Sequence, residues 1–114
     1  MNDEICYWTG ASGTNYLYHV YERQPDIPSR LGNYIYALKN HEGHWAPVYI
    51  GQGDLSICAA ADPGRMACID AKGATHVHLR LNASEEERLS EVEDLLRRYL
   101  NAHHPHGCNR SSAG

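Results

Sequence analysis

Short runs rich in tyrosine and branched apolar residues alternate with polar turn segments over the first half of the chain. Residues 15–22 (NYLYHVYE), 34–39 (YIYALK) and 47–51 (PVYIG) carry the aromatic and β-branched side chains that suit the half-buried surface of a sheet. Residues 23–31 contain two prolines and indicate a connection, whereas residues 40–43 (NHEG) provide turn chemistry. The pattern predicts three strands, of which the last two form an antiparallel hairpin.

The second half of the chain begins with helix signals and then returns to a strand pattern. Residues 54–61 predict a short helix. Asp62 followed by Pro63 is typical of an N-cap and first helical position, and Gly73 falls where a C-terminal glycine belongs. Residues 74–81 (ATHVHLRL) alternate between two faces, which predicts a fourth strand.

The strongest helix signal follows Ser84. Ser84 and Glu87 form a capping box, in which each side chain bonds the backbone amide of the other residue. The apolar residues that recur at helical spacing are Leu89, Val92, Leu96 and Tyr99, with Leu95 beside them. We expect this stripe to pack against the sheet.

These elements predict a small α+β fold with a mixed, mostly antiparallel sheet of three to four strands and flanking helices. A chain of 114 residues has the length of one domain. Residues 1–30 would add an N-terminal strand and connection to a core over residues 31–110. No apolar run is long enough to span a bilayer, and the acidic start does not resemble a secretory signal, so we expect no membrane partner and a cytoplasmic location.

Composition and charge exclude several classes of protein. Hydrophobic residues make up 42% and charged residues 21% of the chain, which excludes a disordered protein. The net charge of −4 argues against a protein that coats nucleic acid electrostatically, although an enzyme with a small basic patch is compatible with it. The four cysteines include no Cys-x-x-Cys pair, so we expect free thiols rather than disulfides.

Two tyrosine motifs, a later helix and a distal asparagine occur in a characteristic order. Gly32-Asn33-Tyr34 precedes Tyr49-Ile50-Gly51, the long helix follows, and Asn109 lies in the segment Pro-His-Gly-Cys-Asn. This order resembles the GIY-YIG nuclease family over roughly residues 31–110. Tyr36 is a second candidate for the first tyrosine.

The resemblance implies metal-dependent hydrolysis of phosphodiester bonds in DNA, with RNA as the alternative substrate, by an endonuclease that uses Mg²⁺ or Mn²⁺. In this reading Tyr34 is the general base and Tyr49 orients water or phosphate. Glu91 or Glu93 holds the metal ion, and Asn109 supports the site.

The chain departs from the family pattern at two catalytic positions. Cys58 stands where the family has an arginine, and Val92 stands where it has a glutamate, between Glu91 and Glu93. The residues that could supply positive charge toward nucleic acid instead are Arg65, His76, His78 and Arg80, of which the last three share one strand face. A second hypothesis is therefore a catalytically degenerate member that acts as a nucleic-acid-binding or protein-binding module.

Each candidate also has a purely structural interpretation. Tyr34 and Tyr49 are compatible with ordinary sheet aromatics, and Glu91 and Glu93 with a solvated helix face. A polar cluster after the helix contains His103, His104, His106 and Cys108. Imidazole and thiolate suit zinc, but the spacing matches no common zinc motif, so a polar loop is the alternative.

Overall fold

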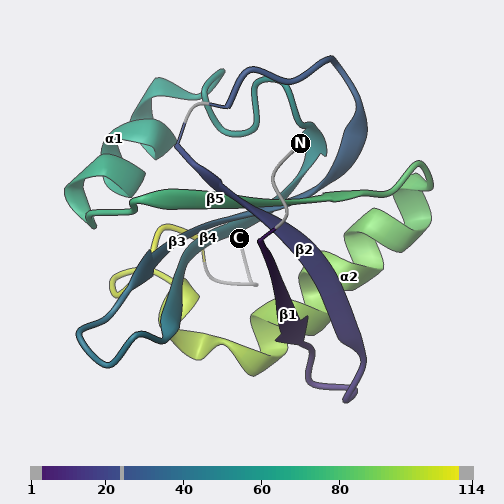
Figure 1. The fold of residues 1–114 in the computed structure, drawn as a ribbon. Coiled ribbons are helices and arrows are strands. Elements are labelled where there is room, and N and C mark those ends of the chain that lie inside the picture. Colours follow the sequence, from purple (N-terminus) through teal and green to yellow (C-terminus); the bar gives the residue numbers. More distant parts are fainter. Residues whose placement is uncertain (1–3, 24, 111–114) are drawn as a thin grey trace.

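The computed structural model describes residues 4–23 and 25–110, which form an α+β fold with a curled five-stranded sheet and two α-helices (Figure 1). The strand order is β1-β2-β5-β3-β4, and each neighbouring pair is antiparallel. The strands are β1 (Ile5–Thr9), β2 (Asn15–Glu22), β3 (Leu31–Lys39), β4 (Trp45–Asp54) and β5 (His76–Leu81). The helices are α1 (Pro63–Ala71), α2 (Glu85–Arg98) and the short 3₁₀ helix η1 (Leu100–Ala102).

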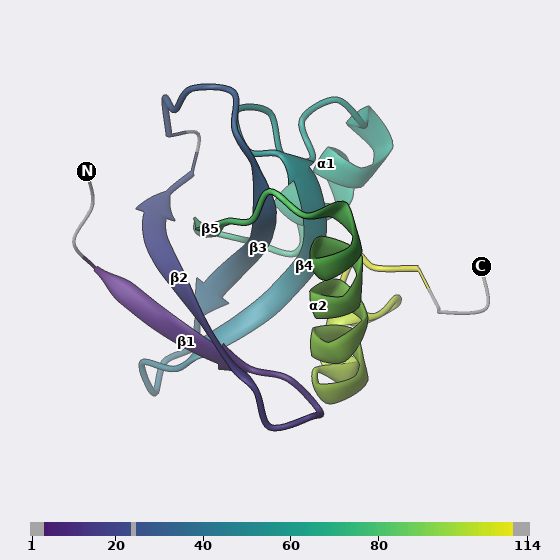
Figure 2. The ribbon, with the colours of Figure 1, turned by 90° about the vertical axis from the view of Figure 1, so that its right-hand side faces the viewer.

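The two α-helices belong to two core clusters on opposite faces of the sheet. Tyr34 belongs to the cluster that includes Ile69 of α1, whereas its neighbour Ile35 belongs to the cluster that includes Leu95 of α2. Successive residues of a strand point to opposite faces, so α1 and α2 cover different sides. Figure 2 shows α2 running alongside β4, with α1 at a separate end of the curled sheet.

The sheet has five strands, more than the three to four expected, and its neighbouring pairs are antiparallel rather than mixed. The additional strand is β1, which pairs with β2 from Ile5 opposite His19 to Thr9 opposite Asn15. β1 is only five residues long and lacks a clear alternation of polar and apolar positions. The formation of β1 therefore depends on its pairing with β2, and its own sequence does not predict a strand.

The prediction of a short helix over residues 54–61 is wrong. Asp54 ends β4, and residues 55–61 form consecutive hydrogen-bonded turns. Cys58 has a φ of 49°, a left-handed backbone conformation that an α-helix does not contain.

The two longer helices begin where the capping signals place them. The Asp62 side chain accepts a hydrogen bond from the Arg65 amide at the start of α1, and the Ser84 side chain accepts one from the Glu87 amide at the start of α2. Gly73 follows α1 with a φ of 82°, which glycine adopts without steric cost. None of the helices in the described part of the chain is long and apolar enough to cross a membrane.

The prediction of which side of α2 packs against the sheet is only partly right. Its buried residues are Arg88, Glu91 and Leu95, whereas Leu89 is 51% exposed. Val92 and Leu96 are half-buried at the margin of the core. Arg88 and Glu91 turn inward because the sheet offers them hydrogen-bonding partners, which the apolar pattern of the helix does not encode.

Candidate functional site

The two motif tyrosines lie together on the face of the sheet that α1 covers. Tyr34 of β3 pairs across the sheet with Gly51 of β4, and the ring centroids of Tyr34 and Tyr49 are 6.1 Å apart. A Cβ atom at Gly51 would approach both rings to 2.8 Å. The glycine of the second motif therefore leaves the space that the Tyr34 ring occupies.

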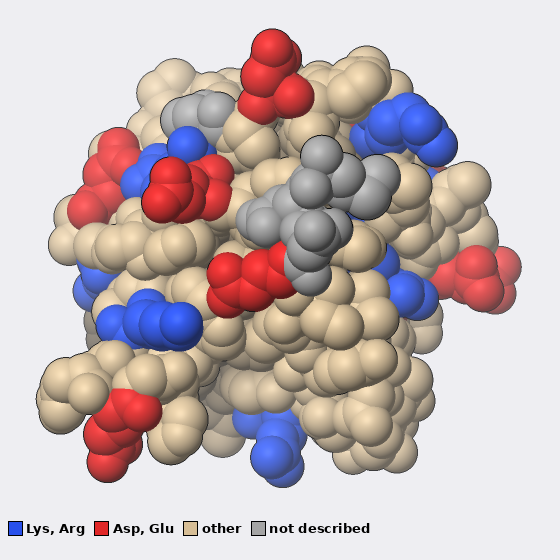
Figure 3. Space-filling view, viewed as in Figure 1, with Lys and Arg blue, Asp and Glu red and all other residues tan. Residues whose placement is uncertain are grey.

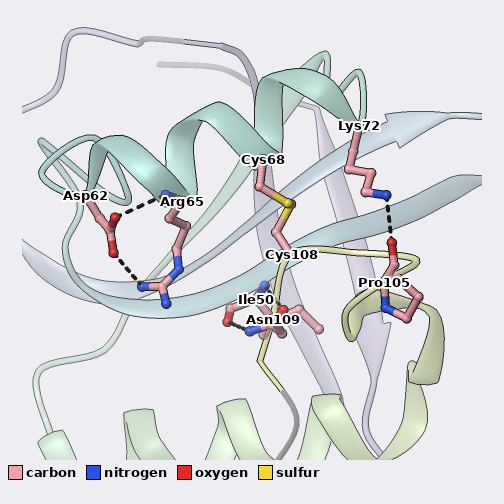
Figure 4. Close-up of a disulfide and its surroundings, with 8 residues drawn as sticks. All are labelled: Ile50, Asp62, Arg65, Cys68, Lys72, Pro105, Cys108 and Asn109. Carbon is pink, nitrogen blue, oxygen red and sulfur yellow. Dashed lines mark hydrogen bonds and ion pairs between the residues drawn. A yellow bond between two sulfur atoms is a disulfide. The ribbon is translucent and has the colours of Figure 1, made fainter. Parts of the chain in front are cut away.

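An arginine of α1 lies beside the tyrosine pair. The Arg65 guanidinium lies 4.8 Å from the centroid of the Tyr49 ring. It also forms an ion pair with Asp62 at 3.5 Å, and Asp62 caps the helix through the Arg65 amide (Figure 4). Arg65 lies in the first turn of α1, three residues after the N-cap Asp62.

Both tyrosines are buried beneath α1, and their ionisation is suppressed. Burial is the main cause that raises the pKa of Tyr34, and the neighbouring Tyr49 adds to it. Burial also raises the pKa of Tyr49, although the positive charge of Arg65 partly opposes this. The two phenols therefore stay protonated at neutral pH, and neither is prepared to accept a proton from water.

The candidate metal ligands lie elsewhere. Glu91 projects from α2 to the opposite face of the sheet, where it accepts hydrogen bonds from the Tyr18 hydroxyl and from Arg80 Nε at 3.0 Å. Glu93 is exposed and pairs with Arg97 one helical turn later, at 2.5 Å. The structure therefore does not bring either carboxylate to the tyrosine pair.

His76, His78 and Arg80 share the α2-side face of β5, as their spacing predicts, but this face is covered. His78 is fully buried, and its Nδ1 accepts a hydrogen bond from Trp8 Nε1 at 2.9 Å. Burial lowers the pKa of His78 to about 3, with a smaller contribution from His76, so the ring is neutral. Since Arg80 is bound to Glu91, these three residues do not form an open basic row.

Asn109 contacts the second tyrosine motif through the backbone. Its Nδ2 donates to the Ile50 carbonyl at 2.9 Å, and its Oδ1 accepts from the Ile50 amide at 2.8 Å (Figure 4). The Cys108 amide donates to the Val48 carbonyl in the same segment. The Asn109 side chain therefore satisfies the hydrogen bonds that a neighbouring strand would otherwise make with Ile50 at the outer edge of β4.

A disulfide joins Cys68 of α1 to Cys108, so the prediction of free thiols is wrong for this pair and holds for Cys6 and Cys58. The pairing depends on a contact between segments 40 residues apart, which cysteine spacing does not reveal. It also removes Cys108 from the zinc cluster considered above. Within residues 4–23 and 25–110, no three His, Cys, Asp or Glu side chains converge as metal ligands would.

Comparisons of the chain with protein-family models, with curated proteins and with solved structures give no match. The resemblance to the GIY-YIG family therefore depends on the residues themselves. Of these, Tyr34, Tyr49 and Arg65 lie together, Asn109 contacts the backbone of the second motif, and the acidic candidates lie apart.

Proposed function

We propose that this chain is a GIY-YIG-like domain that binds a nucleic-acid phosphate beside Arg65 and does not hydrolyse the phosphodiester bond. One observation carries the proposal. Arg65 lies at the tyrosine pair, whereas Glu91 and Glu93, the carboxylates that hydrolysis would use, are engaged elsewhere with arginine partners.

The likeness to the family is supported by how the motif residues pack. Gly51 makes room for the ring of Tyr34, Tyr49 lies between that ring and Arg65, and Asn109 fixes the backbone of the tyrosine-isoleucine-glycine motif. These are interactions between distant segments, and ordinary sheet aromatics do not require them together. Their joint presence favours the packing of a GIY-YIG motif over that of unrelated sheet aromatics.

A phosphate-binding role is supported by a pocket of about 210 Å³ at the start of α1. Its lining includes Arg65, His104 and Arg110, with Asp62 as the acidic member. A guanidinium offers two parallel donors to the oxygens of a phosphate. The ion pair of Arg65 with Asp62 is long, at 3.5 Å, and partly exposed to solvent. Ion pairs near the surface contribute little to stability, so a phosphate could replace the carboxylate at small cost.

The charge distribution limits this contact to a small area. On the face shown in Figure 3, Lys and Arg side chains are separated by acidic and uncharged ones. With a net charge of −4 for the whole chain, long-range attraction to nucleic acid is absent. We therefore expect weak binding that involves few phosphates and is measurable at low salt.

Hydrolysis is disfavoured by the same geometry. The residues assigned to Mg²⁺ or Mn²⁺ do not fit a metal site that includes the tyrosines, because Glu91 and the tyrosine pair lie on opposite faces of the sheet. The proximity of Tyr34, Tyr49 and Arg65 is the one observation that favours an endonuclease as the second candidate.

Binding is tested by fluorescence anisotropy with a labelled single-stranded DNA of about 20 nucleotides in about 20 mM salt. We expect Arg65→Gln to weaken binding about fivefold or more, since it removes the guanidinium at the pocket. Arg98→Gln is the matched control, because Arg98 lies at the end of α2 away from the pocket. Equal effects of the two variants, or no binding by the native chain, would contradict the proposal.

Cleavage is tested separately with plasmid and single-stranded DNA in Mg²⁺ and in Mn²⁺. The proposal predicts intact DNA in both metals. Cleavage that disappears in Tyr34→Phe would establish the endonuclease instead, whereas cleavage that survives this substitution would come from a contaminant or from another site.

A further inference from the structure

Helix α2 turns one face toward the sheet and carries an apolar stripe on a second face, which the sheet leaves partly open. Leu95 points into the core with Arg88 and Glu91, whereas Leu89 and Leu96 lie roughly 100° further round the helix. Sheet packing accounts for the first face. The second face is covered only in part: Val92 and Leu96 pack against the margin of the core, whereas Leu89 is 51% exposed.

The second face continues past the end of α2 and forms an open groove of about 670 Å³. Leu89, Val92, Leu96 and Leu100 line the groove, and Glu93 and Arg97 border it. Leu100 is 71% exposed, more than any other large apolar side chain in the described part of the chain. A run of apolar residues at this spacing is typical of a helix that packs against another helix.

We propose that a second copy of this chain occupies the groove, with the two α2 helices packed antiparallel about a two-fold axis. The apolar stripe of Leu89, Val92, Leu96 and Leu100 can pack against a second copy of itself. A two-fold axis perpendicular to α2, at the level of Leu95 along the helix, brings Leu89 close to Leu100 of the second copy. The same rotation places Glu93 beside Arg97 of the second copy. Within one chain these two side chains pair with each other at 2.5 Å, and because both are mainly exposed they can exchange this partner for the one on the second copy.

The antiparallel arrangement follows from the position of the charges. Glu93 and Arg97 lie on the same flank of the apolar stripe, one helical turn apart. In an antiparallel pair related by a two-fold axis, equivalent flanks of the two helices face each other. Each Glu93 then meets an Arg97. In a parallel pair about a two-fold axis, equivalent flanks lie on opposite sides of the contact, so Glu93 and Arg97 of the two copies do not meet.

The experiment is sedimentation equilibrium of the full chain over about 1–500 µM, with dissociation constants fitted for each variant. We expect a monomer–dimer equilibrium in this range. Leu100→Glu should raise the dimer dissociation constant about tenfold or more, because it introduces a charge into the apolar contact. Leu81→Glu is the matched control, since Leu81 is 60% exposed on β5, outside this groove, and should leave the constant unchanged.

A charge exchange distinguishes this arrangement from non-specific association. Glu93→Arg and Arg97→Glu should each weaken the dimer about fivefold, and the double variant should restore it to within about threefold of the native constant. A chain that stays monomeric over the whole range would overturn the proposal. So would a dimer that Leu100→Glu leaves intact, or one that the double variant fails to restore although circular dichroism shows each variant to be folded.

Discussion

Replacing Asn109 by alanine tests whether this residue acts mainly as a structural clamp on β4. Its side chain holds both the amide and the carbonyl of Ile50, a residue that is 1% exposed, through hydrogen bonds of 2.8 and 2.9 Å. The substitution removes both partners at once. One buried donor and one buried acceptor are then left without protein partners.

The expected loss of stability follows from these two groups. Each buried polar group that loses its partner costs about 1–3 kcal/mol, and water entering from the loop side recovers part of this. We therefore expect Asn109→Ala to lower the free energy of unfolding by about 2–4 kcal/mol. The measurement is urea unfolding followed by circular dichroism, with the denaturant dependence unchanged from the native chain.

Asn101→Ala is the control, because Asn101 is exposed in η1 and its replacement should change stability by less than about 0.5 kcal/mol. If Asn109→Ala is as stable as Asn101→Ala, the clamp contributes nothing to the fold. The role of the Asn109 side chain would then have to be contact with a ligand.

Three further predictions concern the packing, the buried histidine and the disulfide. Gly51→Ala should destabilise the chain by about 1–3 kcal/mol in urea, since its Cβ would meet the Tyr34 ring at 2.8 Å. Gly64→Ala in α1 should not, since its Cβ would make only an ordinary contact of 3.7 Å with the Asp62 side chain. Lowering the pH from about 7 to about 5 should cost about 2 kcal/mol through His78, because the unfolded chain takes up a proton near pH 6.5 that the folded chain, with the pKa of His78 at about 3, does not bind. His78→Asn keeps an acceptor for Trp8 and should remove this share of the pH dependence; an unchanged pH profile would contradict the assignment. Reducing the disulfide should lower stability by about 4 kcal/mol for a separation of 40 residues, and the oxidised, denatured chain should titrate two thiols rather than four.

The features of the fold that local chemistry determines could be predicted from the sequence. Asp62 and Ser84 mark the helix starts because a cap depends only on neighbouring backbone amides. The shared face of His76, His78 and Arg80 follows from strand alternation alone. In each case the residues that carry the sequence signal and the residues that form the feature are within a few positions of each other in the chain.

The features that distant segments determine could not be predicted in this way. The inward face of α2 depends on Tyr18 and Arg80, which give Glu91 buried partners. The bond between Cys68 and Cys108 depends on how the C-terminal loop returns along β4 to α1. For the same reason the contact of Arg65 with the Tyr49 ring could not be predicted, because it depends on how α1 packs against the sheet.

The most direct test of the phosphate-binding account is an NMR titration of the ¹⁵N-labelled chain with single-stranded DNA at low salt. The account predicts that backbone amide shifts change around Arg65, His104 and Arg110, while those around Glu91 stay unchanged. Changes concentrated around Glu91 and Arg80, or no changes at all, would contradict it.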